Sequence, residues 1–174
     1  ESESDIAFRI NSEAVELLAK EATLLNAWFI HYSTDYVFDG SKQGAYVETD
    51  TTAPLGIYGQ SKLAGEEAIR ASGCKHVILR ASWVYAARGN NFIKTILRLA
   101  GGRDELKIVC DQIGAPTSAE LLADVTACCL YRLKYDAFLS SEWSGTYHLA
   151  ASGIISWHGF ARFILDEALH LGVR

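Results

Sequence analysis

The stretch that decides the fold is Ala27-Trp28-Phe29-Ile30-His31-Tyr32-Ser33, a nearly continuous apolar run of strand length. Such a run is typical of a strand that is buried on both faces of a parallel sheet. Before it, residues 11–26 have helical spacing, with an apolar stripe at Ala14, Leu17, Leu18, Ala22 and Leu25. After it, a loop over residues 34–56 leads to a second helix, which we expect to end near Ala71 with Gly73 as its stop.

The rest of the chain continues the alternation of strand and helix. We expect strands over residues 76–81, 106–109 and 145–149. We expect helices over residues 92–100, after a capping box at 117–120, and from Ser156 to Gly172. Alternation of this kind predicts an α/β fold with a mainly parallel sheet. No internal repeat or linker divides the sequence, so we treat residues 1–174 as a single unit.

Composition excludes several classes of protein. The 174 residues are 49% hydrophobic, carry a net charge of −5 and include no apolar run of membrane-spanning length, which argues against disorder, a nucleic-acid surface and a membrane protein. The four cysteines lack metal-site spacing, and we expect reduced thiols and therefore a cytoplasmic location. The chain has no methionine and opens on Glu1, so we expect it to be a piece of a longer protein.

Tyr58 and Lys62 form the first chemical motif. They are four residues apart and therefore lie on one face of the predicted helix. A nearby ammonium favours the phenolate and is expected to lower the pKa of the tyrosine, so that the pair can exchange a proton with a carbonyl or alcohol oxygen. There is also an ordinary interpretation, a solvated tyrosine and lysine on a surface helix. Taken alone, the motif favours this interpretation.

The positions around the pair favour the chemical interpretation. Ser33-Thr34-Asp35 lies where the first strand ends, and Ala81-Ser82-Trp83 follows the second strand. In open α/β sheets, ligands bind outside the carboxyl ends of the strands. His31 and His148 lie within predicted strands, so we interpret both as packing residues rather than ligands.

At the level of ordered motifs, the sequence resembles the extended short-chain dehydrogenase/reductases, and among them the dTDP-4-dehydrorhamnose reductase family. The resemblance runs from about Phe8 to the C-terminus. It is carried by Thr34-Asp35-Tyr36-Val37-Phe38-Asp39-Gly40, residues 58–66, Ser82-Trp83-Val84-Tyr85, Gly89-Asn90-Asn91-Phe92, residues 111–117 and Ser156-Trp157-His158. It implies a partial Rossmann-like fold and reduction of the 4-keto group of dTDP-4-dehydro-L-rhamnose to dTDP-L-rhamnose with NADPH or NADH.

The resemblance also implies a role for each matching residue. Tyr58 would protonate the 4-keto oxygen, Thr34 would hydrogen-bond the same oxygen, and Lys62 would hold the nicotinamide ribose. Both Tyr58 and Lys62 would therefore contact the cofactor. The substrate would be bound by Thr34 and Asp35 together with Trp83, Asn90 and Asn91.

Several of these residues have plainer interpretations. Trp83 would equally suit an apolar core, Asp35 could cap the loop after its strand, and Asn90 could cap the following helix. Glu120 matches a carboxylate that some bacterial members of the family use at a metal-bridged dimer interface, where Mg²⁺ would bind. The capping box already explains that residue, so we predict no metal ligand set.

The sequence departs from the family in lacking the glycine-rich turn that meets the cofactor pyrophosphate. We therefore expect weak NAD(P)H binding and little activity from these residues, and micromolar cofactor affinity in a fluorescence titration would contradict this. The strands missing relative to the family would lie beside the run 27–33, whose edge would then be exposed. We expect either a clipped longer chain or edge-to-edge association, such as a homodimer.

Two other functions stay open. A non-catalytic nucleotide-binding subunit is the main alternative, because the regulatory β subunit of methionine adenosyltransferase is similar in sequence. A sugar epimerase or dehydratase of the same superfamily is less compatible, since it would need a second acid/base carboxylate beside Thr34, which Asp35-Tyr36 does not supply.

Overall fold

A computed structural model describes residues 3–135 and 140–172. The chain divides into two compact units, which are described separately. The first comprises Glu1–Ala81 with Cys129–Leu149, and the second comprises Ser82–Cys128 with Ala150–Arg174. Among the described residues, none of the helices is long and apolar enough to cross a membrane.

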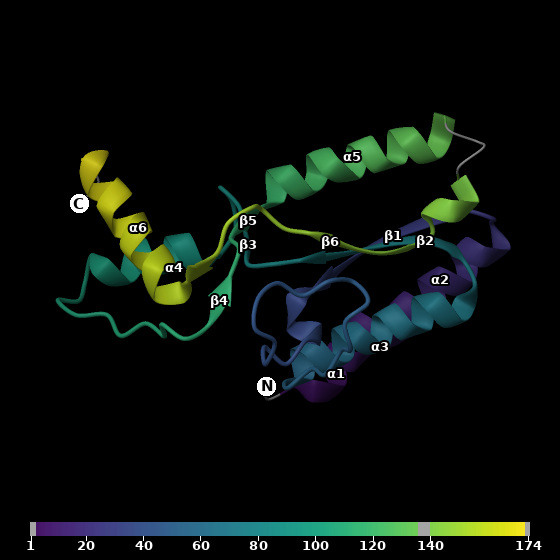
Figure 1. Ribbon diagram of the computed structural model, residues 1–174, viewed down its shortest axis with the longest axis horizontal. Helices are drawn as coiled ribbons and strands as arrows, with labels where there is room; N and C mark the ends of the chain where they lie inside the picture. Colours follow the sequence, from purple (N-terminus) through teal and green to yellow (C-terminus); the bar gives the residue numbers. More distant parts are fainter. Residues whose placement is uncertain (1–2, 136–139, 173–174) are drawn as a thin grey trace. The chain divides into compact units, whose positions relative to one another are not determined.

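The first unit is built on a three-stranded parallel sheet (Figure 1). Its strands are β1 (Trp28–Thr34), β2 (Lys75–Ala81) and β6 (Gly145–Leu149), in the order β1-β2-β6. Ser33 of β1 is paired with Arg80 of β2, and Arg80 is paired with His148 of β6. The parallel sheet confirms the predicted α/β class, and the strand bounds differ from the predicted ones by at most one residue.

Helices cover both faces of this sheet. On one face, α2 (Ala14–Leu24) and α3 (Ile57–Ser72) lie side by side (Figure 1) and pack with β2 through Val15, Ala19, Ile69 and Ile78. On the other face, Leu133 at the end of α5 (Ala119–Tyr135) packs against Val77 and Leu79. Neighbouring residues of a strand point to opposite faces of the sheet, so Ile78 belongs to the first cluster and Val77 to the second.

The predicted apolar stripe of the first helix is wrong except at Ala22. Leu17, Leu18 and Leu25 are exposed, whereas Val15, Ala19 and Ala22 are buried. The small residues are buried because α3 approaches closely: a Cβ on Gly65 would lie 2.1 Å from the carbonyl oxygen of Asn11. The helical segment also begins earlier than predicted, with α1 (Ser4–Phe8) and a π-helical turn (Arg9–Glu13) before α2.

The second unit contains two small sheets and two complete helices. The strand β3 (Val84–Tyr85) pairs with β5 (Thr117–Ser118), and β4 (Ile113–Gly114) pairs with β7 (Ile155–Ser156). The helices α4 (Phe92–Ala100) and α6 (Trp157–His170) pack around a core of Ile96, Phe160, Ala161 and Ile164.

Two local predictions in this unit are wrong. Residues 106–109 form no strand; Ile108 packs on the core, and the Val109 carbonyl accepts a hydrogen bond from the His158 N–H instead of a strand partner. At the start of α5, Ser118 rather than Thr117 caps the helix, because its hydroxyl accepts the Leu121 N–H at 3.1 Å. Glu120 therefore does not occupy the capping-box position, and its side chain is exposed.

Candidate active site

The first turns of α3 hold Tyr58 and Lys62 at the carboxyl end of β1. Gly56 precedes the helix in extended conformation, and Gly59 packs so closely that a Cβ there would lie 2.1 Å from the Tyr36 carbonyl oxygen. This contact draws the start of α3 against the turn that follows β1. Tyr58 is 48% exposed, and its ring meets the Tyr36 ring edge-on with centroids 6.0 Å apart.

Thr34 ends β1 directly beside Tyr58. Its buried hydroxyl donates to Asp35 Oδ1 at 3.2 Å and accepts the Tyr36 N–H at 3.2 Å, which caps the short 3₁₀ turn Asp35–Val37. The Thr34 hydroxyl is also near enough to Tyr58 to lower the pKa of its phenol. The structure therefore brings Thr34, Asp35 and Tyr58 together, as predicted.

The predicted electrostatic effect of Lys62 on Tyr58 is wrong. Burial raises the pKa of the Tyr58 phenol and the Asp35 carboxylate adds to this, while the Thr34 hydroxyl only partly opposes them. The Lys62 ammonium is instead bonded to β1: it donates to the Tyr32 carbonyl at 2.6 Å and lies 3.3 Å from His31 Nε2. Tyr58 is thus a protonated phenol at neutral pH.

His31, interpreted from the sequence as a packing residue, is partly buried and also lies beside Lys62. It stacks on Phe29, with ring centroids 6.2 Å apart, and also contacts Lys62. Burial and the Lys62 charge lower the pKa of His31 to about 4, opposed by the charge of Glu66, so the ring is neutral at pH 7. The available signal was strand alternation, which places His31 and Ser33 on the same face of β1.

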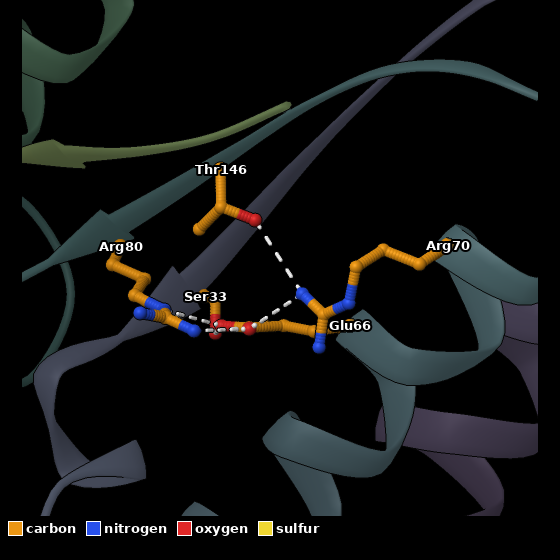
Figure 2. A network of polar contacts seen from close by, with 5 residues as sticks. All are labelled: Ser33, Glu66, Arg70, Arg80 and Thr146. Atoms are coloured by element: carbon orange, nitrogen blue, oxygen red, sulfur yellow. Dashed lines mark hydrogen bonds and ion pairs between the residues drawn. The ribbon is translucent and has the colours of Figure 1, made fainter. Parts of the chain in front are cut away.

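Glu66 was missed by the sequence analysis, although it follows Lys62 by one helical turn. Its carboxylate is fully buried and is bound by Ser33 of β1, Arg80 of β2 and Arg70 of α3 (Figure 2). Burial by itself raises the pKa of this carboxyl, but the hydrogen bonds from Arg80 and Ser33 and the Arg80 charge outweigh burial and hold the pKa below its ordinary value.

The remaining predicted residues belong to the second unit. Trp83 adopts a positive φ of 44° and stacks on Trp157, with ring centroids 3.5 Å apart, so it packs on the core of that unit. Asn91, not Asn90, caps α4 by accepting the Lys94 N–H at 3.2 Å. Asn90 is exposed and lines a surface hollow with Lys94, Thr95 and Arg98.

The arrangement in the first unit suits chemistry at a carbonyl or alcohol oxygen. The Thr34 hydroxyl lies near the Tyr58 phenol, and the Lys62 ammonium lies on the same helical face as the phenol. Within the described residues, no group of three or more His, Cys, Asp or Glu side chains forms a metal-binding cluster.

Comparison with known proteins identifies a family. The family model of the RmlD substrate binding domain matches residues 1–172. The dTDP-4-dehydrorhamnose reductase of Escherichia coli K12 is 51% identical over 173 residues, which cover 99% of this chain and 56% of that protein. The chain thus spans about half the length of the curated relatives it matches.

Solved structures agree with this result. A dTDP-4-dehydrorhamnose reductase from Clostridium acetobutylicum superimposes with a TM-score of 0.85 at 38% identity, covering 95% of this chain and 56% of that one. A dTDP-4-dehydrorhamnose reductase from Bacillus anthracis, in complex with NADP, superimposes with a TM-score of 0.82 at 38% identity, covering 97% and 57%. With the family model covering nearly every residue, the chain belongs to the RmlD substrate binding domain family.

Proposed function

We propose that this chain supplies the substrate-binding and proton-donating part of an NADPH-dependent reductase that converts dTDP-4-dehydro-L-rhamnose to dTDP-L-rhamnose. The observation that carries the proposal is the placement of Tyr58 and Lys62 at the carboxyl end of β1, where Lys62 binds the Tyr32 carbonyl at 2.6 Å and Gly59 packs on the Tyr36 carbonyl. Its relatives at 51% identity are named dTDP-4-dehydrorhamnose reductases, which supports the choice of substrate.

Tyr58 acts as the general acid. Reduction of a ketone places negative charge on the carbonyl oxygen, which must receive a proton as the alcohol forms. The raised pKa of Tyr58 keeps this proton on the phenol until the oxygen becomes basic. Thr34 hydrogen-bonds the same oxygen and stabilises its developing charge.

Lys62 and Tyr58 would hold the cofactor at its nicotinamide ribose. An ammonium and a phenol on one face of α3 are suitable hydrogen-bonding groups for sugar hydroxyls, and a relative of known structure has NADP bound. When bound, NADPH supplies the hydride. Lys62 contributes position and charge, since its ammonium is fixed on the Tyr32 carbonyl.

The remaining substrate contacts are proposed residue by residue. Asp35 would bind sugar hydroxyls through the carboxylate that Thr34 already contacts. Trp83 would offer its partly exposed ring to the deoxysugar, and Asn90 and Asn91 would contact the nucleotide. A cytoplasmic location fits a biosynthetic enzyme whose cysteines form no disulfide. Glu120 is exposed, as a residue at an interface between copies would be, but no metal ligand set is proposed there.

A chimera tests this function. In it, the present chain replaces the residues it matches in the Escherichia coli reductase, so that the rest of that enzyme completes the protein. We expect oxidation of NADPH that depends on dTDP-4-dehydro-L-rhamnose. A folded chimera that binds the nucleotide sugar without turning it over would instead favour a binding subunit.

A further inference from the structure

A buried carboxylate lies behind the candidate active site and is not used by the proposed reaction. Glu66 follows Lys62 by four residues and Tyr58 by eight, so all three lie on one face of α3. Its side chain has no exposed surface. An ionised group in such a position needs partners that compensate for its lost hydration.

Four hydrogen bonds from three elements provide that compensation (Figure 2). Glu66 Oε1 accepts from Ser33 Oγ at 2.5 Å and from Arg80 Nε at 2.9 Å. Glu66 Oε2 accepts from Arg80 Nη2 at 2.7 Å and from Arg70 Nη1 at 3.2 Å, and Arg70 Nη1 also reaches Thr146 of β6 at 3.4 Å. One carboxylate thus ties α3 to two neighbouring strands.

The strand residues that bind Glu66 are next to the candidate catalytic groups. Ser33 immediately precedes Thr34, and Ser33 is the register partner of Arg80. Because Glu66 binds both residues, it fixes the position of α3 along the strands. The positions of Lys62 and Tyr58 relative to Thr34 are fixed with it. We propose that Glu66 is a positioning residue for Lys62, which seats α3 on the ends of β1 and β2 and keeps a negative charge one turn behind the ammonium.

The electrostatic surroundings of Lys62 agree with this role. His31 of β1 faces the ammonium, Tyr58 lies one turn earlier with Asp35 near it, and Glu66 lies one turn later with Arg80 and Arg70 behind it. Burial lowers the pKa of Lys62, and the charge of Glu66 opposes that effect. On the face of α3 that meets the π-helical turn, the contact is made by uncharged Asn11.

The inference deepens the proposed function, because it gives Glu66 a task through Lys62. Its test is chosen to be independent of turnover. Lysines labelled with ¹³C at Cε are titrated by NMR in this chain, and the Lys62 resonance is identified by its loss in Lys62→Arg. Glu66→Gln removes the charge and preserves the shape. The control is Glu67→Gln, the same change at the adjacent, exposed residue.

In Glu66→Gln we expect the titration midpoints of Lys62 and His31 to move to lower pH, and in Glu67→Gln we expect both to stay. A folded Glu66→Gln chain with both midpoints unmoved would show a merely structural ion pair and overturn the proposal.

If Glu66→Gln does not fold, the ¹³Cδ resonance of Glu66 in the unsubstituted chain decides. It must stay that of a carboxylate at pH 4.5, the ordinary glutamate value, and titration at or above that pH contradicts the proposal.

Reductase activity separates the two proposals. A chimera that reduces no sugar refutes the proposed function but leaves the Lys62 titration as it was. Conversely, an active chimera in which Glu66→Gln leaves the Lys62 midpoint unmoved keeps the function and removes the role of Glu66.

Discussion

At the scale of single residues, the candidate site combines groups that hold their protons differently from free side chains. Tyr58 retains its proton because its ring is packed and Asp35 is near, whereas His31 stays neutral because it is buried against Lys62. The residue types and spacing in the sequence could predict that Thr34, Tyr58 and Lys62 meet. They could not predict the directions of the pKa shifts, because these depend first on how deeply Tyr58 and His31 are buried and then on which charged groups face them.

His31 should make stability depend on pH. Its pKa is lowered from 6.5 to about 4 on folding, so between these values the unfolded chain binds more protons than the folded chain. Stability is therefore complete above pH 6.5 and is lost as the pH falls towards 4, by at most about 3 kcal/mol. Urea unfolding at a series of pH values measures this loss.

The matched variants are His31→Gln and His170→Gln. His31→Gln should flatten the profile between pH 6.5 and 4, while the exposed His170 should leave it as in the parent chain. An unchanged slope in His31→Gln would mean that the ring is not held neutral by the fold.

At the scale of elements, the position of α3 on its sheet determines the site. Close backbone contacts at Gly59 and Gly65 set its distance from its neighbours, and Glu66 ties it to the strands. The sequence could predict α3 and both strands from apolar runs and the Gly73 stop. It predicted that Ala22 would be buried, but not Val15 and Ala19, because leucine is more apolar and only tertiary contact between α3 and the preceding helix favours the face that carries them.

Gly65→Ala tests the close helix contact. The added Cβ would lie 2.1 Å from the Asn11 carbonyl oxygen, which is backbone and must shift. We expect a loss of about 1–3 kcal/mol in the free energy of unfolding, despite the better helix propensity of alanine. Gly102→Ala is the control, since a Cβ at that position would meet no other atom within 4 Å; equal stability of the two variants would refute the contact.

The two arginines bound to Glu66 should differ in energetic weight. The Arg80 side chain is 4% exposed, and its loss leaves a buried carboxylate short of two hydrogen bonds, so Arg80→Met should cost about 3–5 kcal/mol. The Arg70 side chain is 40% exposed, so Arg70→Met should cost less than about 1 kcal/mol. Urea denaturation compares them, and losses of similar size would contradict the network as described.

At the scale of the whole molecule, the chain spans about half the length of its curated relatives, and β1 is paired on one side only among the described residues. The predicted α/β class and family are confirmed. Both depend on the order of strands, helices and motifs along the chain, which the sequence shows directly. The predicted strand at 106–109 was wrong because apolar periodicity reports burial of Ile108 and not the presence of a hydrogen-bonding partner strand.

An unpaired strand edge should promote association of the purified chain. In the described residues β1 is an edge strand, and an edge strand can pair with another copy. We expect the average mass in sedimentation equilibrium to rise with concentration and the outward amides of β1 to be protected from hydrogen exchange at high concentration. A chain that stays monomeric, with those amides protected, would contradict this expectation.

The role of Tyr58 as proton donor is the centre of the proposed function, and Tyr58→Phe in the chimera measures it. Removing a general acid costs about 100-fold or more in rate. We therefore predict that sugar-dependent NADPH oxidation falls at least about 100-fold in Tyr58→Phe, with the nucleotide sugar still bound, while Tyr131→Phe, at an exposed tyrosine of α5, keeps the parent rate. A Tyr58→Phe chimera that turns over as fast as the Tyr131→Phe control would contradict it.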